Sequence, residues 1–178
     1  MVLRALRLKL GYAPAREPRL LFFHEVTVKR RIWYGLGGVV AFLGLAQLIP
    51  ISRTNPTSAG EIDVPPEVST ILHRACYDCH SNETVWPWYS HVAPVSWLVA
   101  SDVSEGRENV NFSEWGKLDP AQRTKKQRKI GHEVAGGDMP EFYYVPMHPR
   151  AKLSDADRKL IDNWAKGPTA GVRSAGGK

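Results

Sequence analysis

The longest apolar stretch of the 178-residue chain lies near its N-terminus. Residues 32–49 read IWYGLGGVVAFLGLAQLI and contain no charged side chain. As a helix that rises about 1.5 Å per residue, they would cover roughly 27 Å, close to the thickness of a hydrocarbon core. Lys29, Arg30 and Arg31 come directly before this stretch, and the positive-inside bias then places the N-terminus in the cytoplasm. The pattern predicts a single transmembrane anchor over residues 32–49, with the rest of the chain exported.

Two alternatives to this anchor remain. The stretch could be a buried core helix, or a signal peptide cleaved after the small-x-small sequence that ends at Ala46. The 31 residues before it and its own 18 residues both exceed the usual dimensions of a signal peptide. An uncleaved anchor is therefore the preferred interpretation, and a signal peptide would export the domain as well.

Beyond residue 60, helical periodicity and boundary residues predict four helices, whereas no alternating run is long enough to predict a sheet. The expected helices are Pro66 to Arg74, Pro94 to Glu105 with Gly106 as its stop, Pro120 to Ala135 before Gly136 and Gly137, and the stretch from the Ser154 cap to Gly167. On the fourth helix, the side chains expected to share one face are Leu153, Leu160, Ile161 and Trp164.

These features divide the chain into five parts. A basic cytoplasmic arm is expected over residues 1–31, the anchor over 32–49 and a flexible Pro/Ser/Thr-rich linker over 50–60. A small all-α domain follows over 61–167, and a Gly-rich disordered tail over 168–178.

Composition narrows the functional classes. Apolar residues make up 43% of the chain, which is enough for a hydrophobic core. The net charge of +6 comes from residues 1–31, which hold eight basic and two acidic residues, so the remainder is formally neutral. A nucleic-acid-binding domain needs surplus positive charge of its own, so nucleic acid is not an expected partner. With only two cysteines, a scaffold of several disulfides is excluded.

Those cysteines carry the main chemical signal. Cys76, Tyr77, Asp78, Cys79 and His80 form a C-x-x-C-H sequence, the pattern of covalent c-type haem attachment. Two thiols at this spacing can each form a thioether to one porphyrin, and the next residue then reaches the iron as its proximal ligand. Export supports this interpretation, because such attachment is made outside the cytoplasmic membrane.

Three other uses of the cysteines stay open. A thioredoxin-type dithiol would need an α/β context, and a disulfide between residues three apart would add little stability. A zinc site could use both cysteines with two histidines chosen from His73, His80, His91 and His132, although their spacing matches no zinc motif.

A sixth iron ligand would separate an electron carrier from a protein with an open iron site. Met139 is the preferred candidate because it follows Gly136 and Gly137 on an expected loop, and methionine opposite histidine suits electron transfer. Met139 could instead fill a core gap. The other candidates are Met147, His148 and His132.

Two further features have both a structural and a functional interpretation. The W-P-W-Y-S sequence at residues 86–90, with Trp97 and Trp115, could wall a haem pocket or simply pack in the core. The basic run could be a solvated helix face or a docking patch for an acidic redox partner; its residues are Arg123, Lys125, Lys126, Arg128 and Lys129.

Residues 61–167 resemble the small haem-binding domain family of bacterial c-type cytochromes. The resemblance rests on C-x-x-C-H, W-P-W-Y-S, N-F-S-x-W, G-x-M-P and H-P-x-A-x-L-S segments in that order. It implies a cytochrome c-like fold with one covalent haem c, attached at Cys76 and Cys79, with His80 as proximal and Met139 as distal ligand. Met147 stands where the family more usually has an aliphatic residue.

Together these features predict a membrane-anchored mono-haem cytochrome that carries single electrons on the periplasmic side and is not an enzyme. The alternative is a haem-based sensor or peroxide-handling protein with an exchangeable sixth ligand.

Overall fold

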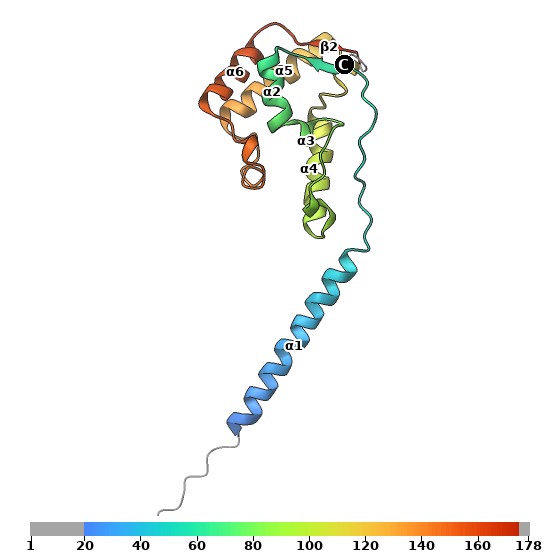
Figure 1. Ribbon diagram of the computed structural model, residues 1–178, viewed down its shortest axis with the longest axis vertical. Helices are drawn as coiled ribbons and strands as arrows, with labels where there is room; N and C mark the ends of the chain where they lie inside the picture. Colours follow the sequence, from blue (N-terminus) through green and yellow to red (C-terminus); the bar gives the residue numbers. More distant parts are fainter. Residues whose placement is uncertain (1–19, 175–178) are drawn as a thin grey trace, which may run out of the picture. The chain divides into compact units, whose positions relative to one another are not determined.

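A computed structural model describes residues 20–174, with side chains from residue 27 onward, and shows a mostly helical protein (Figure 1). This confirms the all-α expectation in its main feature. The chain forms two units, Met1–Leu45 and Ala46–Lys178, which are described separately. The first contains helix α1, Leu20–Ala46, except for its last residue, and the second contains all the other described elements.

The predicted transmembrane helix is not found. Helix α1 ends at Ala46 rather than Ile49, and its turns before Ile32 contain Lys29, Arg30 and Arg31. Within residues 20–174, no helix combines the length and the apolar character that a membrane crossing requires. Residues 20–31 of the predicted basic arm belong to α1, whereas residues 1–19 lie outside the described residues.

In the second unit, the predicted helices α2, Pro66–Ala75, α5, Pro120–Gly136, and α6, Asp155–Lys166, are present with the expected boundary residues. Capping boxes at Asp119 and Ser154 begin α5 and α6 by accepting backbone N–H groups that have no partner within the helix. Gly137, with φ of 86°, ends α5 in the left-handed conformation that glycine adopts most easily.

Helices α2, α5 and α6 enclose the core. One face of α2 is buried, and the fully buried side chains of the core include Leu72, Phe112, Trp115 and Ile161. Helix α5 approaches α6 closely at Gly131, where an added Cβ would lie 2.4 Å from that of Ala165. Of the side chains expected to share one face of α6, Leu153 and Ile161 are buried, whereas Leu160 is exposed.

Helix α4, Val95–Asn109, continues past the glycine expected to end it. Gly106 is buried inside the helix, where it faces the short helix α3, Tyr77–His80. An added Cβ would lie 2.5 Å from the Cys79 carbonyl oxygen, so glycine is needed here for close packing and not as a stop.

A small sheet was not predicted. Strand β1, Glu61–Asp63, pairs antiparallel with β2, Gly171–Arg173, with Ile62 opposite Val172. The expectation of a disordered tail is therefore wrong for β2, whereas residues 175–178 lie outside the described residues. Three short 3-10 helices, Trp88–His91, Trp115–Lys117 and Pro149–Ala151, complete the elements.

The linker predicted to be flexible is bound to the domain. Arg107 of α4 donates hydrogen bonds to the Thr54 carbonyl at 2.8 Å and to Asn55 Oδ1 at 2.9 Å. The same guanidinium also binds the Ser81 carbonyl at 2.8 Å and Thr84 Oγ1 at 2.9 Å. These bonds fix residues 54–55 beside the loop that follows α3, so the ordered unit begins well before residue 61.

Candidate cofactor site

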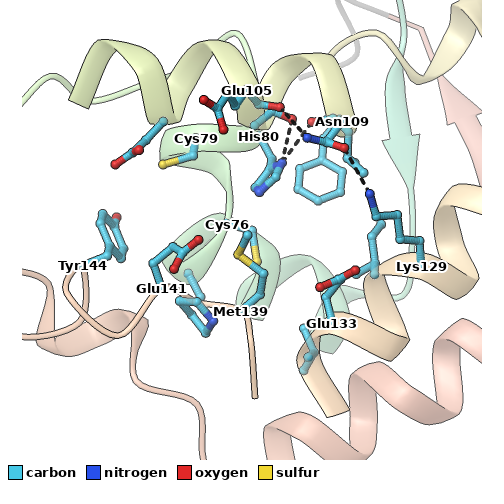
Figure 2. A pocket seen from close by; sticks show the side chains of 18 of the residues that line it. Cys76, Cys79, His80, Glu105, Asn109, Lys129, Glu133, Met139, Glu141 and Tyr144 are labelled. Carbon is cyan, nitrogen blue, oxygen red and sulfur yellow. Dashed lines mark hydrogen bonds between the residues drawn. The ribbon is translucent and has the colours of Figure 1, made fainter. Parts of the chain in front are cut away.

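A pocket of about 340 Å³ lies between α3, α4, α5 and the loop after α5 (Figure 2). Its apolar walls include Val110, Phe112, Ile130 and Val134. The residues predicted to carry the chemistry, Cys76, Cys79, His80 and Met139, also line it. The structure thus brings together side chains that are up to 63 positions apart in the sequence.

His80 is oriented by the backbone of α4. Its Nδ1 lies 2.9 Å from the Gly106 carbonyl and 3.1 Å from the Val110 carbonyl. Because both partners are acceptors, Nδ1 carries the proton, and Nε2 retains a lone pair on the side that faces the pocket (Figure 2). Burial lowers the pKa of His80, although the two backbone bonds oppose this effect. A neutral imidazole held in this way is suited to bind a metal.

Both cysteine thiols are kept uncharged. Burial, with the neighbouring Cys79, raises the pKa of Cys76 to about 12. Burial also raises the pKa of Cys79 to about 12, together with the charges of Asp102, Asp78 and Glu141. A dithiol redox centre needs an accessible thiolate, which this environment disfavours. A thioether is uncharged, so the same environment suits covalent attachment.

Met139 enters the pocket from the loop that follows α5. After the left-handed turn at Gly137, the backbone N–H groups of Asp138 and Met139 donate to the Glu133 carbonyl at 3.0 and 3.2 Å. The side chain packs against the core, and Figure 2 shows it on the other side of the pocket from His80 in that view. Met139 and His80 therefore line the same pocket, although they come from different elements.

The other predicted distal candidates do not line this pocket. Met147 is 56% exposed, and His132 lies exposed on α5. His148 stacks on Tyr144 with ring centroids 3.9 Å apart, and its Nδ1 contacts the Tyr144 carbonyl at 3.3 Å.

The sequence did not predict a hydrogen bond that crosses the edge of the pocket. The Tyr144 hydroxyl donates to Asp78 Oδ2 at 2.7 Å. Because Asp78 stands between the two cysteines, this bond ties the attachment motif to the loop that carries Met139. The sequence shows an acidic residue between the cysteines, Asp78, and a tyrosine in the loop after α5, Tyr144. No sequence pattern indicates that these two residues form a pair.

The tryptophans do not wall the pocket. Within the described side chains, none of the six is among the residues that line it. Trp115 is a core residue whose indole N–H lies 3.4 Å from the Ala170 carbonyl, and Trp88 is 74% exposed. The core-packing interpretation therefore holds for Trp115, and neither interpretation holds for Trp88.

The basic run lies on α5 and is partly used by the fold. Arg123 Nε donates to the Trp115 carbonyl at 3.3 Å, and Lys126 to the Asn109 carbonyl. Lys129 donates to Asn109 Oδ1 at 3.0 Å beside the pocket.

The residues present fit a haem. The pocket surface is mostly apolar, two uncharged thiols line it, and a partly buried imidazole directs its unprotonated nitrogen inward. The zinc alternative finds no support, because no three His, Cys, Asp or Glu side chains among the described residues group together as a metal site would.

Fold and site together define a helical domain built to bind haem. The chain belongs to the haem-binding domain family, whose model matches residues 41–167, well over half of the sequence. No curated protein and no solved structure matches it.

Proposed function

We propose that this protein is a mono-haem c-type cytochrome that carries single electrons. The observation that supports this proposal best is the shared pocket of the two thiols, His80 and Met139. Cys76 and Cys79 would hold the porphyrin, each thiol adding across one vinyl group so that its hydrogen goes to the neighbouring carbon. When bound, the haem supplies a one-electron couple between ferrous and ferric iron.

The chain's own residues would keep both iron ligands in position when the iron changes its oxidation state. The Gly106 and Val110 carbonyls fix the His80 ring, so its Nε2 is presented without a reorienting step. The Tyr144 bond to Asp78 restrains the loop that presents Met139. A site filled by histidine on one side and methionine on the other favours electron transfer over ligand binding.

The intact mass of the denatured protein tests covalent attachment. We expect the full chain, expressed with c-type maturation machinery, to be heavier than its polypeptide by one haem. The variant Cys76→Ala/Cys79→Ala should lose this mass. A bare polypeptide mass for the wild type would overturn the proposal.

The sixth ligand separates the electron carrier from a haem-based sensor or peroxide-handling protein. With Met139 bound to iron, the reduced protein should not change its spectrum under carbon monoxide. Met139→Ala should open the site, so that carbon monoxide binds and the reduction potential falls. Carbon monoxide binding by the wild type would instead support the exchangeable site.

We further propose that the domain works outside the cytoplasm, attached to the cytoplasmic membrane through α1. Exposed apolar residues of α1, among them Trp33, Val40 and Phe42, support attachment to lipid. Haem is attached covalently outside the cytoplasmic membrane. A denatured protein that is heavier by one haem would therefore also indicate that the domain had been exported. Recovery of the protein in the membrane fraction, and its release when residues 1–45 are removed, would test this attachment.

A further inference from the structure

Two segments beside the pocket carry acidic residues and no lysine or arginine. Residues 81–106 contain Glu83, Asp102 and Glu105, and residues 135–149 contain Asp138 and Glu141. Other parts of the domain contain lysine and arginine, most densely in the basic run on α5. A strictly acidic character in both segments predicts a negative potential on the surface that they share.

The two segments meet at the pocket. The Tyr143 hydroxyl donates to Asp102 Oδ2 at 3.5 Å, and the Tyr89 hydroxyl lies 3.4 Å from His148 Nε2. Three of the carboxylates line the pocket, namely Asp102, Glu105 and Glu141. Asp102 and Glu141 also contribute to the raised pKa of Cys79, so their field reaches the attachment motif.

Large apolar side chains are exposed on the same segments. Phe142 is 84% exposed, Trp88 is 74% exposed and Met147 is 56% exposed. Trp88 packs edge-on against Tyr89, and Phe142 packs edge-on against Tyr143, which keeps these rings ordered at the surface. We call Trp88, Tyr89, Phe142, Tyr143 and Met147 together the aromatic face. An exposed aromatic cluster rimmed by charge is typical of a protein interface.

We propose that the aromatic face, with its rim of Asp102, Glu105 and Glu141, docks a redox partner protein that presents lysine and arginine side chains around an apolar centre. This inference rests on the proposed function, because it names the place where electrons would be exchanged. Tyr143 belongs to both the face and the pocket lining, so a partner docked there would lie next to the cofactor.

The negative charge of the rim favours a basic partner protein over a second copy of the chain or a lipid surface. A second copy of the chain would bring two acidic rims together, and an anionic lipid surface would be repelled by the same rim. The basic run on α5 is the competing face, but three of its five side chains already donate to the protein itself.

Redox-inert paramagnetic ions can map the docking charge on the haem-loaded full chain. Hexaamminechromium(III) is cationic and hexacyanochromate(III) is anionic, and each broadens NMR signals of nearby nuclei. We expect the cationic complex to broaden Trp88, Phe142 and Tyr143, and the anionic complex to broaden Lys125 and Arg128. If the cationic complex left the Trp88, Phe142 and Tyr143 signals unbroadened, the proposal would be overturned.

Carboxylate variants test which groups are responsible. Asp102→Asn/Glu141→Gln should reduce broadening by the cationic complex at least threefold, whereas Glu67→Gln on α2 should leave it unchanged. The single variant Glu105→Gln is a second test, because this exposed side chain accepts a hydrogen bond from Ser101 and its replacement keeps a similar shape. Unchanged broadening in both variants would show that other charges attract the ion.

A peptide of alternating lysine and leucine tests the apolar part of the face, with a glutamate and leucine peptide as its control. The lysine peptide should shift the Trp88 and Phe142 signals, and Trp88→Ala should weaken its binding several-fold. Equal binding of both peptides would contradict the charge argument. Shifts of these signals caused by phosphatidylglycerol vesicles, or by protein concentration alone, would instead identify a lipid or a second copy as the occupant.

The docking result can be separated from the result for the proposed function. The broadening depends on the surface charges of the folded chain, whereas the intact mass reports covalent haem. A haem-bearing protein whose aromatic face attracts neither probe would overturn the docking proposal alone.

Discussion

Replacing Gly106 with alanine tests how closely α4 lies against Cys79 of the C-x-x-C-H motif. An added Cβ would stand 2.5 Å from the Cys79 carbonyl oxygen, 3.0 Å from its carbonyl carbon and 3.2 Å from its Cβ. Two of these three atoms are backbone, so no side-chain rotation can relieve the clash. Helix α4 would have to move away from α3 by roughly 1 Å to restore ordinary contact.

The free energy of unfolding should fall by about 2 kcal/mol. Overpacking a buried contact costs about 1–3 kcal/mol, and a clash with backbone belongs at the upper end of this range. Alanine in a helix interior returns about 1 kcal/mol through its better helix propensity. For a domain of this size, the net loss lowers the melting temperature by roughly 6–10 °C.

Thermal unfolding of the haem-loaded full chain, followed by far-ultraviolet circular dichroism, measures this effect. Gly136→Ala is the matched control, because its Cβ would meet only the movable Asp138 carboxylate at 2.9 Å. The control should change stability by less than about 0.5 kcal/mol. A Gly106→Ala variant that is as stable as the wild type, or more stable, would refute the close packing inferred here.

Three further substitutions test other contacts. Gln127→Leu should cost about 3 kcal/mol in urea unfolding, because the Pro168 carbonyl and the Ala170 N–H would lose the buried amide as their partner, and the Trp164 carbonyl would keep only the Gly167 N–H. Tyr144→Phe removes the bond to Asp78, and it should speed hydrogen exchange in residues 139–148 roughly tenfold, as read by mass spectrometry. Partial burial raises the pKa of Asp157, but bonds from Arg74 and Ser154 outweigh it and lower that pKa from 3.8 to about 2. The folded pKa is the lower one, so this pair stabilises the fold above about pH 4, and about 1 kcal/mol should be lost between pH 4 and 2 after allowance for solvent screening. Asp157→Asn should remove that pH-dependent part of the unfolding free energy, and an unchanged acid profile would contradict this assignment.

Local signals predicted most of the helices. Pro66, the Asp119 and Ser154 caps and Gly137 act through backbone groups within a few residues, so their effect can be read directly from the sequence. Gly106 was misread because glycine can mark either a helix end or a close approach, and only the packing partner distinguishes them. Gln127 lies among basic residues that predict a solvated face, yet it is buried against the end of α6.

Long-range pairings were out of reach. Strands β1 and β2 are three residues each, too short for an alternating pattern, and they pair across almost the whole domain. In the site, C-x-x-C-H and the glycines before Met139 pointed to four residues that line one pocket, Cys76, Cys79, His80 and Met139, but not to the other side chains around them. The bond between Asp78 and Tyr144 spans 66 positions, and no local rule connects its two ends.

The four hydrogen bonds of Arg107 have a mechanical consequence. A pull on the chain ahead of residue 54 would meet resistance at this guanidinium, before any force reached β1. Because the same side chain binds the Ser81 carbonyl, the load would be shared with the segment directly after the C-x-x-C-H motif. A fragment cut at Glu61 would lose two of the four acceptors, so the smallest unit that bears this load intact begins before Thr54.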